Sequence, residues 1–270
     1  MVAAWAACLC GHGEANSRTL LLLISKKATP TMSMLGFLKP PHLGWVVRNL
    51  RDALVDKLKG SPRRPEQARA YVEANATRGD PASVLATLDD FARHQRFLMN
   101  VGPEKGQLLE AEVDRAGKNA RILEVGCYCG YSAILMARRL GEQGRITSLE
   151  KSGTSVAAAR AIVDFAGLSG AVEIRHGASS ELIPTLEGNF DLVFLDHWKD
   201  LYEPDLRAIE AAHLLRPGSI VFADNVGSLF DPKQYLAYVR ECGHYESRSE
   251  ESHIEYTKLP DCAEISVFLG

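Results

Sequence analysis

Oxygen-bearing side chains follow two apolar segments in the C-terminal half of the chain. Asp196 ends the segment 190–196, and Asp224 ends the segment 219–224, directly before Asn225. A lone carboxylate is costly to bury at the end of an apolar strand, and two carboxylates brought together need a cation between them. Carboxylate and amide oxygens are the ligands that Mg²⁺ prefers. The three residues therefore predict a Mg²⁺ site; the alternative is that both aspartates only cap the helices that follow.

The predicted metal also indicates the kind of substrate. Octahedral Mg²⁺ takes about six ligands, so three protein donors leave room for a water and two substrate oxygens. Lys199 stands three residues after Asp196, and a divalent cation beside it would lower its pKa, which suits a general base. The alternative for Lys199 is a solvated surface lysine. Trp198 is either the wall of an aromatic pocket or ordinary core, and the local pattern leaves Glu255 undecided.

Gly126 and Gly130 enclose a turn between an apolar segment, 120–125, and a helical pattern. Such turns cradle nucleotides, because glycine lets the backbone approach a ligand and the helix start offers N–H groups. Glu150 ends the next apolar segment and is placed to accept hydrogen bonds from ribose hydroxyls; otherwise it is an acid at a helix N-terminus. Tyr128 replaces a glycine of the dinucleotide pattern and leaves less room for a pyrophosphate. We therefore expect a nucleoside ligand without phosphates, such as S-adenosylmethionine, rather than the NAD of an oxidoreductase.

These residues stand where strand patterns give way to helical ones. The alternation predicts an α/β fold, with a parallel sheet, helices on both faces and ligands at the carboxyl ends of the strands. The expected strands are 120–125, 145–150, 172–176, 190–196, 219–224, 253–258 and 263–269. The expected helices are one from Glu66, then 82–98 with Asp80 as its cap, 107–116, 131–140, 154–166, 180–186, 203–215 and 232–241.

Composition excludes some partners. The net charge of -3 shows no basic excess, so we expect no nucleic acid. Six scattered cysteines do not form a disulfide scaffold and indicate a reducing compartment, so we expect a cytoplasmic protein.

The N-terminal part differs from the rest. We interpret residues 1–42 as an extension, disordered or leader-like, and organelle targeting by residues 1–31 stays open. Residues 43–65 read as an amphipathic helix and linker, and weak membrane-surface contact through 43–59 is an open alternative. The apolar run 20–24 is far shorter than the roughly 20 residues that a membrane span needs. The main domain is then 66–270.

Several segments match the motifs of one known family, and the most specific is Asp-His-Trp-Lys-Asp at 196–200. The other matching segments are 79–81, 99–102, 105–107, 128–132, 165–168, 177–179, 182–184, 193–200, 223–226 and 255–256. On these motifs the chain from Glu66 to the C-terminus resembles catechol O-methyltransferase; related caffeoyl-CoA methyltransferases differ after Asp196. The resemblance implies the Rossmann-like class I methyltransferase fold, with a seven-stranded, mostly parallel sheet whose last strand is antiparallel. It also implies an S-adenosylmethionine donor and a Mg²⁺-chelated catechol, methylated by in-line displacement.

The resemblance implies roles for individual residues. Asp196, Asp224 and Asn225 would hold Mg²⁺, Lys199 would be the general base, and Glu255 would hydrogen-bond the second hydroxyl. The cofactor site would comprise Val101, Glu124, Gly126, Tyr128, Ser132, Glu150, Lys151, Ser179, Asp196 and His197. The substrate would contact Phe97, Trp198, Lys199, Asn225 and Glu255.

Some positions depart from the family pattern. Phe97 replaces the usual tryptophan gate, Lys151 replaces an apolar residue, and the loop 226–231 lacks the usual proline wall. The catechol and the methylated hydroxyl therefore stay open, as does action on another vicinal diphenol such as a caffeoyl or flavonoid compound. A non-catalytic adaptor is the alternative of a different class. We expect a monomer.

Overall fold

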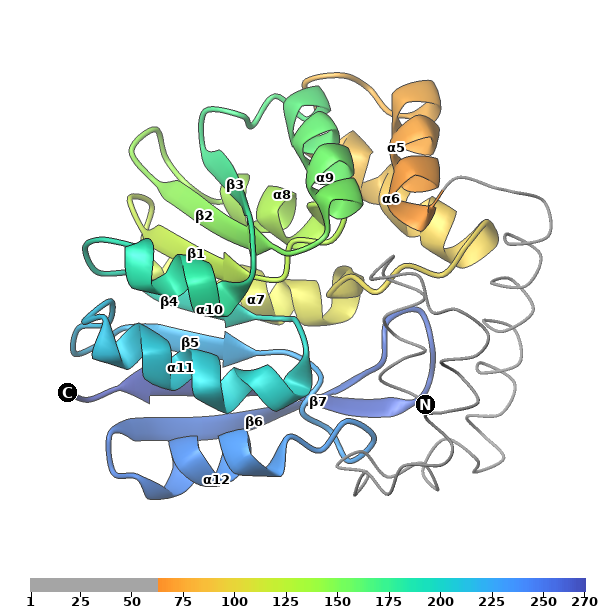
Figure 1. Cartoon of the computed structure of the whole chain (residues 1–270). Coiled ribbons are helices and arrows are strands. Elements are labelled where there is room, and N and C mark those ends of the chain that lie inside the picture. Colours follow the sequence, from red (N-terminus) through yellow and green to blue (C-terminus); the bar gives the residue numbers. More distant parts are fainter. Residues whose placement is uncertain (1–62) are drawn as a thin grey trace, which may run out of the picture.

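A seven-stranded sheet organises residues 63–270, the part of the chain that this computed structural model describes (Figure 1). The strands lie in the order β3-β2-β1-β4-β5-β7-β6. Their bounds are β1 Arg121–Val125, β2 Arg145–Glu150, β3 Val172–His176, β4 Leu192–Leu195, β5 Ile220–Ala223, β6 Tyr245–His253 and β7 Pro260–Phe268. Strands β1 to β5 are parallel, whereas β7 pairs antiparallel with both β5 and β6. The predicted α/β class and the antiparallel last strand are confirmed.

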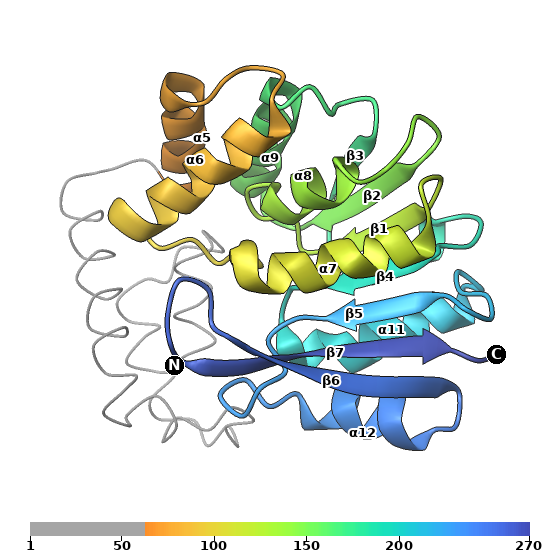
Figure 2. The same ribbon diagram turned by 180° about the vertical axis from the view of Figure 1, so that it is seen from behind.

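Helices cover both faces of the sheet, as the views from opposite sides show (Figures 1 and 2). One face carries α7 (Gly102–Ala116), α8 (Tyr131–Ala137) and α9 (Gly153–Phe165), with α5 (Arg64–Asn75) and α6 (Pro81–His94) packed beyond them. The other face carries α10 (Ser179–Leu182), α11 (Tyr202–Ala211) and α12 (Lys233–Glu241). Alternate residues of β1 divide between two buried clusters, Ile122 on the first face and Leu123 on the second. This division follows from the two-residue period of a strand.

The N-terminus of α6 forms as the sequence predicts. The Asp80 carboxylate accepts hydrogen bonds from the N–H groups of Ala82 at 2.9 Å and Ser83 at 3.1 Å. Pro81 opens the helix, where its missing N–H costs nothing. The cap fixes where α6 begins beside α5.

The predicted strand 253–258 is wrong. Strand β6 spans Tyr245–His253, and residues 254–259 form the connection to β7, closed by a hydrogen bond from Ile254 N–H to the Leu259 carbonyl at 2.8 Å. Because β6 is the edge strand and mostly exposed, its sequence is polar and lacks the apolar run that identifies buried strands. Glu255 therefore lies on a loop beyond the strand.

Several helix bounds also differ from the predictions. Helix α7 begins at Gly102 rather than at 107, α6 ends at His94 rather than at 98, and α5 already begins at Arg64 inside the predicted linker. Proline stands in the first turns of α5 and α7, where it suits the start of a helix as well as it suits a loop. The predicted extension 1–42 and amphipathic helix 43–59 lie outside the described residues.

Candidate active site

The carboxyl ends of β1, β4 and β5 bring the predicted residues to one edge of the sheet. Leu195 pairs with Ala223 in the register of β4 and β5, so Asp196 and Asp224 follow at adjacent positions. Neither aspartate caps the next helix, because the N-cap of α11 is Leu201 and that of α12 is Pro232. The interpretation of the two acids as mere helix caps is wrong.

Gly126 is required where the first turn meets the fourth strand. Its φ is +102°, and a Cβ built there would lie 2.4 Å from the carbonyl oxygen of Asp196. Any other residue would therefore clash with backbone that cannot move as a flexible side chain does. The glycine lets the turn pack directly against the segment that carries Asp196.

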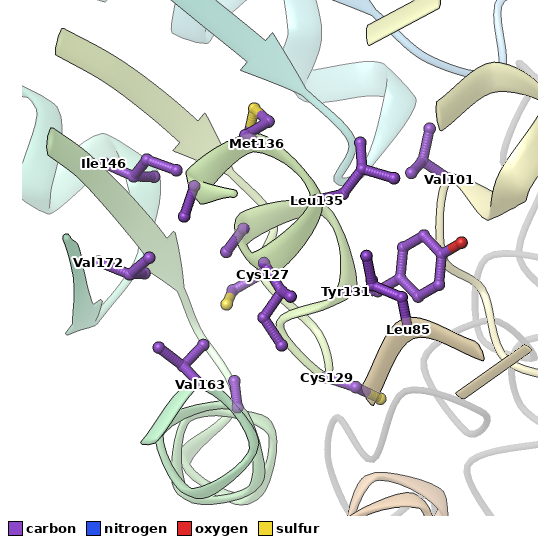
Figure 3. Packing of buried hydrophobic residues seen from close by; sticks show 14 of the residues in the cluster. Leu85, Val101, Cys127, Cys129, Tyr131, Leu135, Met136, Ile146, Val163 and Val172 are labelled. Atoms are coloured by element: carbon purple, nitrogen blue, oxygen red, sulfur yellow. The ribbon is translucent and has the colours of Figure 1, made fainter. Parts of the chain in front are cut away.

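The remainder of the glycine turn is anchored in the core. Gly130, at φ +81°, is the N-cap of α8, and all residues of α8 are buried. Figure 3 shows the surrounding cluster, which includes Cys127, Tyr131 and Leu85. A turn held from below by such packing can present its backbone to a ligand without rearranging.

Glu150 supports this turn from the end of β2. Its carboxylate accepts hydrogen bonds from the N–H of Tyr128 at 2.9 Å and from the N–H of Ser152 at 2.7 Å. The N-cap of α9 is Ser152, so Glu150 does not cap that helix. The carboxylate is thus fixed beside the turn, with lone pairs remaining for further donors.

Glu124 lies beneath the turn and is fully buried. The hydroxyls of Ser132 and Ser148 both donate to its carboxylate. Burial raises the pKa of Glu124 to about 7, because the two hydroxyl donors only partly offset the loss of water.

A buried lysine joins the acids at the end of β5. The Nζ of Lys105, from α7, lies 2.6 Å from Asp224 Oδ1, 2.8 Å from Glu255 Oε1 and 2.8 Å from Asp261 Oδ2. Burial alone would lower the pKa of Lys105, but the three carboxylates raise it well above its ordinary value. Lys105 is therefore an ammonium.

Asn225 belongs to the same cluster. Its Nδ2 donates to Glu255 Oε1 at 2.9 Å and to Asp261 Oδ2 at 2.8 Å. Its backbone N–H donates to Asp224 Oδ1 at 2.7 Å, and its φ is +53°. Asp224 Oδ2 is buried and has no hydrogen-bond partner. One carboxylate oxygen is thus left for a cation.

The acids respond differently to this environment. Burial raises the pKa of Asp224 well above its ordinary value, and the neighbouring carboxylates of Asp196 and Glu255 add to the shift although Lys105 opposes it. Burial would also raise the pKa of Asp261, but Lys105 and Asn225 hold it below its ordinary value. The environment thus favours the ionised form of Asp261, whereas burial and the neighbouring acids favour the neutral form of Asp224 in the absence of a cation.

The Lys199 side chain lies beside Asp196 and is mostly buried. Its Nζ lies 2.6 Å from the Tyr202 hydroxyl and 3.3 Å from Asp196 Oδ1. The Tyr202 hydroxyl in turn donates to the Asp224 carbonyl oxygen at 3.0 Å. The Lys199 side chain is only 11% exposed, so the alternative of a solvated surface lysine is wrong.

The remaining predicted residues surround this edge in different ways. His197 Nε2 pairs with the buried Asp205 at 2.8 Å, Val101 precedes α7 and Ser179 opens α10. Lys151 is exposed, Trp198 is half-buried, and Phe97 is 2% exposed. A cavity of about 210 Å³ adjoins Glu255 and is also lined by Val101 and Tyr256.

Sequence reasoning missed Lys105, Asp261 and Tyr202 as parts of this site. Lys105 appears only within the motif 105–107, and Asp261, the second residue of β7, lies before the predicted strand 263–269. A helix that begins at Gly102 places Lys105 at a core-facing position beside Gly106, but the predicted helix began at 107 and did not include it. Placing it opposite three acids required the tertiary structure.

Comparisons with known proteins bear on the family and the fold of the chain. A family model described as O-methyltransferase matches residues 75–234. Catechol O-methyltransferase B of Danio rerio is 43% identical over 212 residues, which cover 77% of this chain and 80% of that protein. Catechol O-methyltransferase of Mus musculus is 38% identical, covering 85% of this chain and 89% of that protein. The crystal structure of an O-methyltransferase from Bacillus cereus in complex with SAH has a TM-score of 0.60 at 22% identity, covering 75% of this chain and 97% of that one.

Proposed function

We propose a methyl-transfer reaction for this chain, which belongs to the catechol O-methyltransferase family. In this reaction a methyl group passes from S-adenosylmethionine to one hydroxyl of a Mg²⁺-chelated catechol. The observation that carries this proposal is the unpartnered, buried Oδ2 of Asp224 beside Asp196, Asn225 and Lys199. This oxygen is available to a cation at the edge of the sheet where the methyl donor and the acceptor would meet.

The donor would lie over the glycine turn. Gly126 allows close approach, and Glu150 would accept hydrogen bonds from the ribose hydroxyls. The other residues proposed to line this site are Val101, Glu124, Tyr128, Ser132, Lys151, Ser179, Asp196 and His197. These side chains are mostly apolar, hydroxyl-bearing or acidic, which suits a cationic sulfonium ligand without phosphates.

The donor set at the ends of β4 and β5 fits Mg²⁺. Asp196, Asp224 and Asn225 would hold the metal through hard oxygens, and Asp224 Oδ2 has no hydrogen-bond partner that would compete with a cation. When bound there, Mg²⁺ supplies a Lewis acid that makes a catechol hydroxyl more acidic and fixes both catechol oxygens.

Lys199 would take the proton from the attacking hydroxyl. After that transfer its ammonium is held by the Tyr202 hydroxyl and Asp196 Oδ1, the two groups that it contacts in the structure. Glu255 would accept a hydrogen bond from the second hydroxyl. The attacking oxygen then forms a bond to the methyl carbon while the carbon–sulfur bond breaks in line.

A methyl-transfer assay over a catechol panel tests the proposal. The panel includes caffeoyl and flavonoid diphenols and matched monophenols, each with Mg²⁺ and with EDTA. We expect turnover of vicinal diphenols that EDTA abolishes. Turnover of monophenols unaffected by EDTA would contradict the proposal, and no turnover of any diphenol would favour an adaptor.

The described cysteines bear on location. Cys127, Cys242 and Cys262 carry free thiols, which supports a reducing compartment such as the cytoplasm. Among residues 63–270, no helix is long and apolar enough to cross a bilayer.

A further inference from the structure

Lys105 and Asp261 lie next to the proposed metal ligands but belong to neither the ligand set nor the base. We propose that they are positioning residues: they engage one oxygen of Asp224 and of Glu255 and the amide nitrogen of Asn225, so that the remaining oxygen of each side chain is available to the metal or the catechol. The inference rests on the proposed function, since it concerns how the same site is prepared.

Lys105 fixes the two carboxylates. Its ammonium has three N–H donors and three carboxylate neighbours, on Asp224, Glu255 and Asp261. In Asp224 the contact uses Oδ1, and in Glu255 it uses Oε1. The Asn225 backbone N–H also donates to Asp224 Oδ1, so Oδ2 remains the oxygen without a protein partner.

Asp261 orients the amide of Asn225. The two ends of an amide have nearly the same shape, and only the carbonyl oxygen can ligate a metal. Both N–H donors of Asn225 Nδ2 are engaged, one by Glu255 Oε1 and one by Asp261 Oδ2. The amide nitrogen is thereby turned toward the acids, which leaves Oδ1 on the opposite side.

Asp261 is itself fixed by the backbone. Its Oδ1 accepts the N–H of Gly227 at 3.1 Å, and a Cβ on Gly227 would lie 2.7 Å from that oxygen. Asp261 and Lys105 are 3% and 0% exposed. The pair therefore sits in a rigid, water-poor environment, where outer contacts of metal ligands have strong effects.

The same geometry argues against a second metal ion at Asp224, Glu255 and Asp261. Oxygen atoms of these three residues lie within 4.8 Å of one another, which alone would suit a cation. However, the Lys105 ammonium already occupies the centre of that group. The three carboxylates therefore bind the Lys105 ammonium, and the oxygen of Asp224 that is left for the metal is Oδ2.

A charge-neutral double variant separates positioning from electrostatics. Lys105→Met with Asp261→Asn removes one charge of each sign, so long-range attraction for a cation changes little. The dissociation constant of Mn²⁺, measured by electron paramagnetic resonance with S-adenosylmethionine present and no acceptor, should rise at least about tenfold, as expected when outer partners of metal ligands are lost. The Mg²⁺ concentration that gives half-maximal turnover should rise by a similar factor, with the KM for S-adenosylmethionine unchanged.

The matched control is Lys118→Met with Asp114→Asn, another charge-neutral pair, 3.4 Å apart and remote from the site. It should bind Mn²⁺ like the wild type. A folded site double variant with wild-type Mn²⁺ affinity would overturn the inference and leave the proposed function standing. If that double variant does not unfold cooperatively, the single variant Asp261→Asn is measured instead. A rise of less than threefold in its Mn²⁺ dissociation constant would then overturn the inference. Absence of Mn²⁺ binding by the wild type would instead overturn the metal-dependent function.

Discussion

Asp224 and Lys199 lie at the same edge of the sheet but differ in burial and in hydrogen bonding. Asp224 is fully buried with one oxygen unpartnered, whereas Lys199 contacts a hydroxyl and a carboxylate and keeps 11% of its side chain exposed. The first suits a metal ligand, and the second suits a base that must release its proton to solvent after each turnover.

Replacement of the base gives the most direct residue-level prediction. Lys199→Met should lower kcat by about 100-fold or more, because general base catalysis contributes on that order. The affinity for S-adenosylmethionine, measured by calorimetry, should stay within about threefold. Lys233→Met, at an 81% exposed side chain, is the control and should keep wild-type kcat. An unchanged kcat in Lys199→Met would remove Lys199 from the role of base.

Glu124 predicts a pH dependence of stability. Its pKa rises from 4.5 to about 7 on folding because of burial, so the folded state binds a proton that the unfolded state has lost between these values. The stabilisation is complete below pH 4.5 and is lost as the pH rises through 7. Wild-type stability should therefore fall, relative to Glu124→Gln, by up to about 3 kcal/mol between pH 4.5 and 7. Urea unfolding of both proteins without ligand measures this, and a pH-independent difference would contradict it.

The glycine turn packs against the segment that follows β4, and this contact limits which residue can stand at position 126. The connection between β1 and α8 packs on the segment after β4 so closely that Gly126 has no space for a side chain. The turn is thus part of the packing between neighbouring strands as well as a ligand cradle.

Gly126→Ala tests this contact. It should destabilise the protein by about 3 kcal/mol or more, since a positive φ and a backbone overlap act together. Gly79→Ala provides the control, because Gly79 has φ +78° but no atom within 4 Å of a Cβ placed on it; it should cost only about 1–2 kcal/mol. Urea unfolding compares the two. Equal losses would show that the overlap with Asp196 is relieved at no cost.

For the whole molecule, the sheet order joins segments that are distant in sequence. Residues from α7, the segment after β5, the β6–β7 connection and β7 meet around Lys105, although Lys105 and Glu255 are 150 positions apart. A cation bound beside this cluster, by Asp196, Asp224 and Asn225, would therefore stabilise the whole domain, because its ligands come together only in the folded state.

Addition of Mg²⁺ should raise the thermal midpoint of unfolding. At a hundredfold excess over its dissociation constant, the metal should add about 2.7 kcal/mol. Asp224→Asn should abolish this increase but retain the stabilisation by S-adenosylmethionine, as measured by scanning calorimetry. An equal Mg²⁺ effect in wild type and variant would place the metal elsewhere.

The sequence alone determined the fold class, the glycine turn and the acids at the strand ends. Apolar periodicity and residue type are local properties, and in a parallel sheet strand ends necessarily share an edge. Strand β6 was mispredicted because an exposed edge strand needs no apolar pattern. Only the tertiary structure decided that Lys105 enters the acid cluster and that Asp261 holds the Asn225 amide. Those contacts join residues far apart in the chain, and which oxygen of each acid is left unpartnered depends on packing that no local pattern records.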